Sequence, residues 1–159
     1  MASAIAAFIP VRLSSARLPS KAMRRIQGKP CIQYLVERVK RSRKIDLVVI
    51  CTTMKRTDDE LVRVSENLGV ACFRGSEVDI LERYLQAARK HRASSIVNVD
   101  GDDIFCEPSF IDITSETMRN TDTDCVLWRD APLGSTPVGV RTSALEKVCS
   151  MKDVSNTET

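Results

Sequence analysis

Short apolar runs alternate with amphipathic stretches along the 159 residues of this chain. A short continuous apolar run is typical of a strand that is buried on both faces of a parallel sheet. Such runs predict strands at residues 4–10, 47–53, 70–73 and 96–99, with a fifth strand at 124–128 and a last one from residue 138. Apolar residues that recur every three or four positions predict amphipathic helices between them. These helices cover residues 30–43, 57–68, 80–88 and 108–119, with a last helix after the final strand.

Two helix ends carry local signals. Thr57 stands three residues before Glu60, which is the spacing of a capping box, so we expect Thr57 to cap the helix that ends at Gly69. Pro30 suits the first position of its helix, because the amide hydrogen that proline lacks would be unpaired there.

Strands that alternate with helices predict an α/β domain, a three-layer sandwich in which helices cover both faces of a mainly parallel sheet. We expect one domain over residues 1–150, followed at 151–159 by a polar tail or the end of the expressed segment. In open sheets of this kind, ligands bind beyond the carboxyl ends of the strands. The candidate site therefore lies in the loops after Pro10, Cys51, Phe73 and Val99.

Composition narrows the class of protein. Hydrophobic residues make up 43% of the chain and charged residues 28%, as in a water-soluble globular domain. The six cysteines are scattered without a C-x-x-C and the chain has one histidine, so an ordinary zinc site is excluded. That histidine, His91, is expected at the end of a helix, where a cation complements the helix dipole. Reduced cysteines in the core predict a cytoplasmic protein. Because Pro10 and Arg12 break the first apolar run, we expect neither a signal peptide nor a membrane span.

Charge is unevenly distributed along the chain. Residues 1–44 hold eleven lysines and arginines and one acidic residue, whereas the remainder holds thirteen basic and twenty acidic residues. A basic segment of this kind indicates an anionic partner.

The loop after the first strand concentrates the positive charge. It contains neither G-x-G-x-x-G nor G-x-x-x-x-G-K-[ST], so side chains rather than a glycine-rich loop must bind any phosphate. Arg12, Arg17 and Lys21 are spaced to hold several phosphate oxygens, and Ser14 and Ser15 add hydroxyl groups. A solvated basic face is the alternative interpretation.

An acidic turn follows the fourth predicted strand. Asp100, Asp102 and Asp103 offer the hard oxygen ligands that Mg²⁺ prefers. Carboxylates this close repel one another unless a cation lies among them or one of them takes a proton. The alternative interpretation is a solvated acidic turn.

Three segments of the chain resemble the sugar cytidylyltransferases, the enzymes that make CMP-activated acidic sugars. They occur in the family's order and are most similar to its spore-coat polysaccharide synthesis branch: IPVRLSSARLPSK with the following GKP, FRGSEVDILERYLQAA, and IVNVDGDD. The resemblance, over about residues 4–147, implies a nucleotide-diphospho-sugar transferase fold, which is Rossmann-like. It also implies that a hydroxyl of an acidic sugar attacks the α-phosphate of CTP, giving a CMP-sugar and pyrophosphate for surface polysaccharide or glycoconjugate synthesis.

The resemblance also implies roles for single residues. Arg12, Lys21 and Asp102 are the catalytic candidates, and Asp102 and Asp100 are the candidate ligands of Mg²⁺. The nucleotide-binding candidates lie in the strand-end loops: Arg12, Ser15, Arg17, Lys21, Thr52, Thr53, Arg74, Gly75, Ser76 and Asp79.

Several of these positions have a second interpretation. Thr52 and Thr53 could equally satisfy backbone amides at the end of their strand. Asp79 and Arg83 have the i, i+4 spacing of a surface ion pair on a helix. Ser20 stands where the family usually has glycine, the residue that adopts positive φ freely, so this serine could constrict the loop or merely reshape its turn.

Other functions stay open. The family's second metal-binding aspartate comes from a late strand, whereas after residue 130 this chain has only Glu146, Asp153 and Glu158, none in a strand-end motif. The chain is therefore an active transferase, a piece of a longer polypeptide that supplies this carboxylate, or a catalytically incomplete nucleotide-binding module. A nucleic-acid-binding domain ranks last, because the acidic remainder would repel a long polyanion. The expected partners are CTP and an acidic sugar, without nucleic acid or membrane, and a homodimer is allowed.

Overall fold

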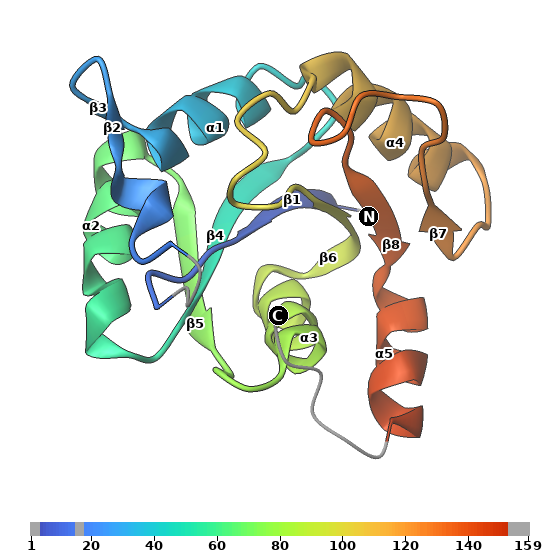
Figure 1. The fold of residues 1–159 in the computed structure, drawn as a ribbon. Helices are drawn as coiled ribbons and strands as arrows, with labels where there is room; N and C mark the ends of the chain where they lie inside the picture. The colour runs from blue at the N-terminus through green and yellow to red at the C-terminus, as the bar shows by residue number, and fades with distance from the viewer. Residues whose placement is uncertain (1–3, 15–17, 153–159) are drawn as a thin grey trace.

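The computed structural model describes residues 4–14 and 18–152. Its centre is a sheet that has, within these residues, six strands in the order β5-β4-β1-β6-β8-β7 (Figure 1). The first four of these are parallel, β8 runs antiparallel to β6, and β7 runs antiparallel to β8. Their bounds are β1 Ala4–Pro10, β4 Leu47–Thr53, β5 Ala71–Gly75, β6 Ala93–Asn98, β8 Val138–Arg141 and β7 Cys125–Val126. The predicted mainly parallel sheet is confirmed.

Helices cover both faces of the sheet (Figure 1). One core cluster joins a face of the sheet to α1, α2 and α4, and the other joins the opposite face to α3 and α5. Side chains of β1 enter the two clusters alternately, and its residues 5–9 are all buried, as the continuous apolar run predicts. The helices are α1 Cys31–Val39, α2 Asp59–Leu68, α3 Ile80–His91, α4 Pro108–Asn120 and α5 Thr142–Met151.

Small elements surround the loop after β1. The 3-10 helix η1 (Lys21–Met23) is followed by a two-stranded hairpin, β2 (Arg25–Ile26) with β3 (Lys29–Pro30), which leads into α1. A second 3-10 helix, η2 (Arg56–Asp58), precedes α2.

Several element bounds differ from the predicted ones. The helix expected at 30–43 ends at Val39, because the chain then turns so that the Asp112 carboxylate accepts from the backbone amides of Arg43 and Lys44. The strand expected at 124–128 keeps only two residues, because Trp128 turns onto α4 and donates to Thr114 at 2.9 Å. The third strand extends to Gly75, and the fourth covers 93–98.

The capping box expected at Thr57 is wrong. Residues 56–58 form η2, and Asp58 directly precedes α2 without a side-chain cap bond. The Asp58 carboxylate is buried and accepts hydrogen bonds from Leu13, Thr52 and Thr53 instead. The other end of α2 is as predicted, because Gly69 takes the left-handed conformation with φ of 61°.

The cysteines are free thiols, as expected. Cys51 and Cys106 are fully buried, but Cys125 is exposed on the short strand β7, so the core role does not hold for every cysteine. The polar tail expected from residue 151 begins inside α5, which ends at Met151, and residues 153–159 lie outside the described ones.

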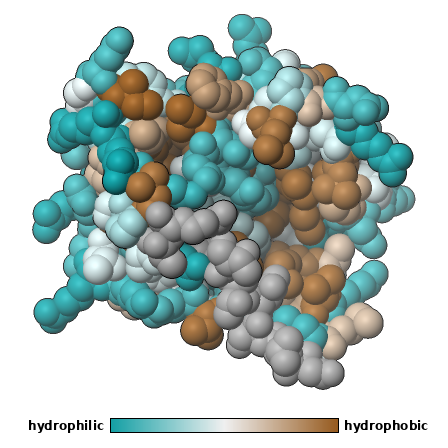
Figure 2. All heavy atoms as spheres, in the orientation of Figure 1, coloured by the Kyte–Doolittle hydropathy of each residue, from teal (hydrophilic) through white to brown (hydrophobic). Residues whose placement is uncertain are grey.

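One group of exposed apolar side chains lies near β8 and α5. Figure 2 shows hydrophobic atoms over the region where β8 and α5 lie in Figure 1. Large exposed apolar residues of α5 and of the segment between α4 and β8 are Leu127, Leu133, Val148 and Met151. Among the described helices, none is long and apolar enough to cross a membrane.

Candidate active site

The candidate site lies where β1 and its two neighbours end. β4 flanks β1 on one side and β6 on the other, so the chain leaves β1 and returns to the sheet in opposite directions. This topological switch point is where ligands of open α/β sheets bind. The three strands end at the same level. The amide of Val99 after β6 donates to the carbonyl of Phe8 at 2.9 Å, and the amide of Val11 after β1 donates to the carbonyl of Cys51 at 3.1 Å. Loops from β1, β4 and β6 therefore begin side by side.

Gly101 lets the acidic turn after β6 lie directly on the end of β1. A Cβ atom at this position would be 2.5 Å from the carbonyl oxygen of Pro10 and 2.9 Å from Cβ of Val11. Only a residue without a side chain permits this approach. The acidic turn is consequently held against Pro10 and Val11, at the start of the loop that carries Arg12.

Lys21 and Asp102 form an ion pair in this region. The Nζ atom of Lys21, at the start of η1, donates to Oδ2 of Asp102, although 81 residues separate them. The two side chains are 35% and 55% exposed, so solvent reaches the pair. The structure thus brings together the basic loop and the acidic turn, as the predicted site requires.

Ser20 adopts a left-handed backbone, the conformation that glycine takes freely. Its φ of 54° and ψ of 27° lie in the left-handed region, and its amide donates to the carbonyl of Leu13 at 3.0 Å. Serine thus accepts a backbone conformation that is unfavourable for a residue with a side chain.

The acidic turn holds more negative charge than Lys21 balances. Burial, and then the charges of Asp100 and Asp102, raise the pKa of Asp103 to about 6, while Lys21 acts in the opposite direction. The amide group of Asn98 donates to Asp100 at 3.0 Å, and its Oδ1 is buried without a hydrogen-bond partner among the described atoms. The predicted repulsion between these carboxylates is thus present, together with the cation that reduces it.

These groups fit a magnesium ion. Across residues 4–14 and 18–152, no three His, Cys, Asp or Glu side chains are arranged as a metal cage. Mg²⁺ does not need one, because it is usually held by one or two carboxylates, water and substrate phosphates. Asp100 and Asp102 supply such oxygens, and the unpaired oxygen of Asn98 lies next to them.

Arg12 is half-buried beside a second arginine that the sequence places elsewhere. Arg83 of α3 is fully buried, so the expected surface pair with Asp79 is wrong. Burial, and to a lesser extent the charge of Arg12, lower the pKa of Arg83. Position 83 is three residues after Ile80 and four before Ala87, a spacing on the buried side of α3 that indicates its burial.

Thr52 and Thr53 end β4 with their hydroxyl groups on Asp58. Both side chains are fully buried, and both hydroxyls donate to Oδ2 of Asp58. The local role that the sequence leaves open, to satisfy a backbone amide, is seen for Thr53, whose hydroxyl accepts from the amide of Lys55 at 3.3 Å. Both hydroxyl groups are bonded to Asp58, so neither threonine is assigned to nucleotide binding.

Arg74, at the end of β5, binds the loop after β4. Its guanidinium donates to the carbonyls of Thr53 and Lys55 at 2.9 and 2.7 Å and to the carboxylate of Asp59 at 2.6 Å. These bonds hold two strand-end loops together on this side of the site.

Gly75, Ser76 and Asp79 shape the turn from β5 into α3. Gly75 packs so closely on Arg83 that a Cβ atom would lie 3.0 Å from its Cγ. The hydroxyl of Ser76 accepts from the amide of Asp79 at 3.1 Å, and Asp79 caps α3 by accepting from the amide of Glu82 at 3.0 Å. Lys152 also forms an ion pair with Asp79. The bonds of Ser76 and Asp79 described here hold the turn at the start of α3. Ser15 and Arg17 lie outside the described residues.

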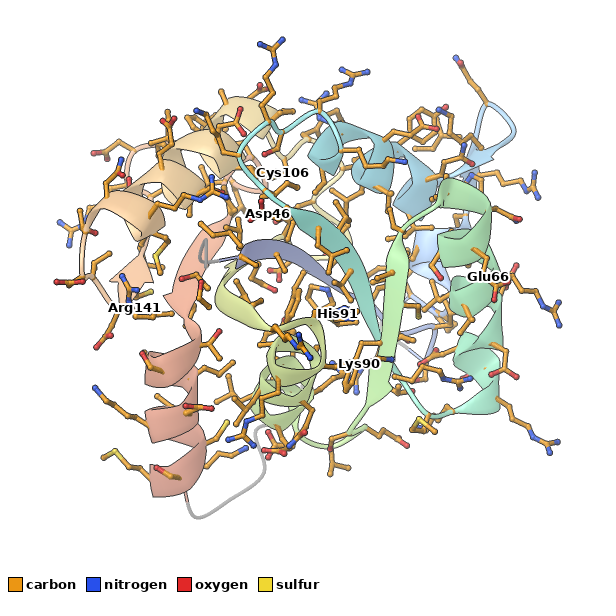
Figure 3. All side chains as sticks on the ribbon, turned by 180° about the vertical axis from the view of Figure 1, so that it is seen from behind. Asp46, Glu66, Lys90, His91, Cys106 and Arg141 are labelled. Atoms are coloured by element: carbon orange, nitrogen blue, oxygen red, sulfur yellow. The ribbon has the colours of Figure 1, made fainter. Side chains whose placement is uncertain are left out.

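His91 differs from its predicted state. Figure 3 shows His91 and Lys90 together at the end of α3. Burial, and then the charge of Lys90, lower the pKa of His91, so the neutral imidazole is favoured rather than the cation expected there.

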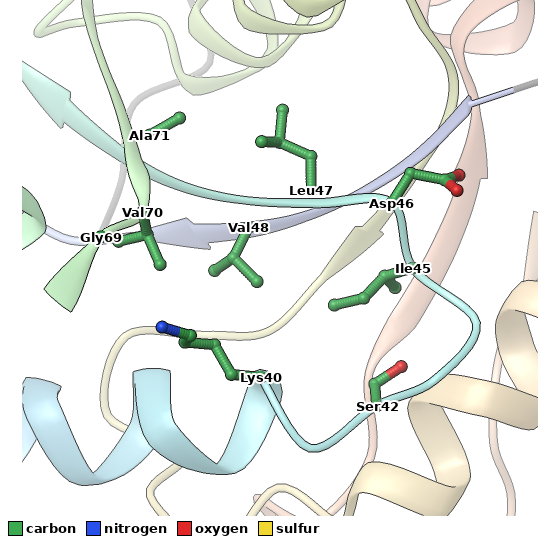
Figure 4. Close-up of a pocket in the computed structure, with 9 residues that line it drawn as sticks. All are labelled: Lys40, Ser42, Ile45, Asp46, Leu47, Val48, Gly69, Val70 and Ala71. Atoms are coloured by element: carbon green, nitrogen blue, oxygen red, sulfur yellow. The ribbon is translucent and has the colours of Figure 1, made fainter.

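A separate cavity lies at the opposite end of the strands, where β4 and β5 begin. It has a volume of about 260 Å³, and residues at the starts of β4 and β5 line it, among them Leu47 and Ala71 (Figure 4). Asp46 at its edge accepts from the amide of Ile5 at 2.8 Å and pairs with Arg119 at 2.9 Å. This cavity is therefore distinct from the candidate site at the carboxyl ends.

Comparisons with known proteins agree with this geometry. The family model described as Cytidylyltransferase matches residues 6–157. The spore coat polysaccharide biosynthesis protein SpsF of Bacillus subtilis is 32% identical over 130 residues, covering 79% of this chain and 54% of that protein. A 3-deoxy-manno-octulosonate cytidylyltransferase of Anaeromyxobacter sp. is 35% identical over 118 residues, covering 72% of this chain and 47% of that protein.

A solved structure is similar to this chain and also belongs to a cytidylyltransferase. A cytidylyltransferase from Leptospira borgpetersenii superposes with a TM-score of 0.90 at 26% identity, covering 96% of this chain and 66% of that one. This chain spans about half the length of the two curated relatives described above.

Proposed function

The chain belongs to the cytidylyltransferase family, and we propose that it transfers CMP from CTP to an acidic sugar with release of pyrophosphate. The product would serve the synthesis of surface polysaccharide or glycoconjugate precursors. The names of its relatives support this setting, since one acts in spore coat polysaccharide biosynthesis and another is a 3-deoxy-manno-octulosonate cytidylyltransferase.

One observation carries the proposal. Lys21 from the basic loop meets Asp102 from the acidic turn at the switch point of the sheet, and Arg12 directly follows Val11, against which this turn packs. A triphosphate with a divalent cation needs positive groups on one side and hard anionic oxygens on the other. The ammonium group of Lys21 supplies the positive charge and the carboxylate of Asp102 supplies the anionic oxygens, and the two groups are hydrogen-bonded to each other.

The proposed chemistry is a substitution at phosphorus. A sugar hydroxyl oxygen bonds to the α-phosphorus of CTP, the bond from that phosphorus to the bridging oxygen breaks, and the hydroxyl proton is lost to water. Negative charge grows on the phosphate oxygens and on the leaving pyrophosphate, so the reaction depends mainly on positioning and electrostatic stabilisation. Arg12 and Lys21 would bind the triphosphate and stabilise that charge.

We propose Asp102, with Asp100, as the residues that hold Mg²⁺. The ion would neutralise charge on the triphosphate and the leaving pyrophosphate when bound. Binding would also take Asp102 away from Lys21, which leaves the ammonium group available for phosphate.

A nucleotide-binding module without turnover is the second candidate. Glu146, one of the late acidic residues, lies on α5 and pairs with Arg89 at 3.2 Å, so it is engaged away from the acidic turn. Asp153 and Glu158 are outside the described residues. This module would bind CTP without forming product.

Melting temperatures measured with CTP, UTP, ATP and GTP, each with and without Mg²⁺, test nucleotide binding, because a ligand of the native state stabilises it. We expect the largest increase with CTP and Mg²⁺. Pyrophosphate release is then assayed with candidate acidic sugars. Release supports the transferase, CTP binding without release supports the module, and no stabilisation by any nucleotide contradicts both.

A further inference from the structure

Leu13 joins the two ends of the basic loop. Its carbonyl accepts from the amide of Ser20 at 3.0 Å, and its amide donates to Oδ1 of Asp58 at 2.9 Å. Arg12 directly precedes Leu13, and Lys21 directly follows Ser20. The separation of the two proposed triphosphate-binding cations therefore depends on where Leu13 is held.

Asp58 connects Leu13 to the end of a central strand. Its Oδ1 faces the Leu13 amide, while its Oδ2 accepts from the hydroxyl of Thr52 at 2.9 Å and from the amide of Thr53 at 3.2 Å. The hydroxyl of Thr53 donates to the same oxygen. β4 is hydrogen-bonded to β1 and to β5, so Asp58 is anchored on a rigid element.

The burial of Asp58 makes this arrangement selective. Its side chain is fully buried, and a buried carboxylate needs hydrogen-bond donors around it. Both of its oxygens serve only as acceptors here, one toward the loop and the other toward β4. An asparagine of the same shape has one oxygen and one NH₂ group, so it cannot accept on both sides.

From this chain of contacts we infer that Asp58 is a positioning residue that fixes Leu13, and through it sets the spacing of Arg12 and Lys21 for a triphosphate. Asp58 does not touch the substrate itself. The inference rests on the proposed function as far as the triphosphate is concerned, whereas the fixing of Leu13 stands independently of it.

The decisive variant is Asp58→Asn, with Ser115→Ala as the matched control. Ser115→Ala removes a fully buried hydroxyl on α4, which donates to the carbonyl of Ile111 at 2.8 Å, and leaves every contact of Asp58 in place. Two quantities are measured for each protein: amide hydrogen exchange of Leu13 and Ser20 by NMR, and the dissociation constant of CTP with Mg²⁺ by calorimetry. Urea unfolding of both variants gives the global stability against which exchange is compared.

We expect Asp58→Asn to speed exchange of the Leu13 amide at least tenfold more than the loss of global stability explains, and to weaken CTP binding at least tenfold. Ser115→Ala should change neither quantity beyond its effect on stability. Equal CTP affinity in Asp58→Asn and the native protein would overturn the inference, and so would the same weakening in Ser115→Ala.

The native protein provides a second test that needs no variant. Its Leu13 amide should exchange as slowly as the amides of β4, and exchange at the rate of an unprotected amide would also overturn the inference. If Asp58→Asn folds poorly, the measurements are made in an osmolyte such as TMAO, which favours the compact state. If the native protein fails to bind CTP, the proposed function fails while the exchange experiment still tests Asp58.

Discussion

Replacing Gly101 with alanine should both destabilise the protein and weaken nucleotide binding. The new Cβ atom would lie 2.5 Å from the carbonyl oxygen of Pro10 and 2.9 Å from Cβ of Val11. Neither neighbour is the end of a flexible side chain, and β1 is hydrogen-bonded to strands on both sides. The acidic turn must therefore move away from β1.

The size of the effect follows from these distances. Non-bonded heavy atoms in contact are usually about 3.5 Å apart, so the turn must shift by about 1 Å. Overpacking of this kind costs about 1 to 3 kcal/mol, and we expect about 2 to 3 kcal/mol for Gly101→Ala because backbone must move. A misplacement of about 1 Å at a reacting centre can also reduce activity about 100-fold.

Gly69→Ala is the matched control. Gly69 has φ of 61° at the end of α2, and an added Cβ would meet nothing within 4 Å. Its cost should be about 1 to 2 kcal/mol, which comes from the left-handed backbone alone. Urea unfolding gives the free energy of unfolding for both variants, and calorimetry gives their affinity for CTP with Mg²⁺.

We expect Gly101→Ala to bind CTP with Mg²⁺ at least tenfold more weakly than the native protein, and Gly69→Ala to bind it equally well. If Gly101→Ala is as stable and binds as tightly as Gly69→Ala, the acidic turn is not positioned by its contact with β1. The assignment of Asp102 and Asp100 to the ion would then lose its structural basis.

Three further predictions concern single side chains. Ser20→Gly should raise the free energy of unfolding in urea by about 1 kcal/mol, because glycine adopts this φ without a steric penalty, and a decrease would contradict the strain described for this serine. Lys21→Ala should weaken CTP binding in calorimetry at least tenfold. It should lower the free energy of unfolding by less than about 1 kcal/mol, because the ion pair with Asp102 is exposed to solvent. Asp102→Asn should remove the Mg²⁺ dependence of CTP binding. Since the pKa of His91 is lowered on folding, the unfolded chain binds this proton more tightly, and stability should fall as the pH drops from about 6.5 through the folded-state pKa. His91→Gln should reduce that slope in urea titrations, and an unchanged slope would refute the assignment.

The fold was predictable because its signals are local. A parallel strand buried on both faces must be apolar at successive positions, so β1 and β4 stand out as runs. The same runs identify the strand ends, and these place Lys21 and Asp102 in neighbouring loops. Strand order then decides that the two loops meet, and this information is not carried by either loop alone.

The errors concern residues whose surroundings in the folded protein differ from what their sequence neighbours indicate. Thr57 has the spacing of a helix cap, but Asp58 beside it binds Leu13, which is 45 residues away. Arg83 stands four residues after Asp79, which is the spacing of a surface ion pair on a helix, yet its side chain on α3 is fully buried. His91 has basic neighbours at a helix end, and burial rather than the helix dipole decides its charge. Tertiary contacts overrode a valid local rule in each case.

The central place of β1 has a consequence for how the chain is made. Ala6 pairs with Leu47 on one side and with Ile96 on the other, so β1 leaves the ribosome about 90 residues before one of its two partner strands. At about 5 to 20 residues per second, that delay is roughly 5 to 20 seconds. Throughout it, an apolar strand has an open edge that could pair with another nascent chain. Chaperone demand during translation should therefore be greatest before β6 emerges.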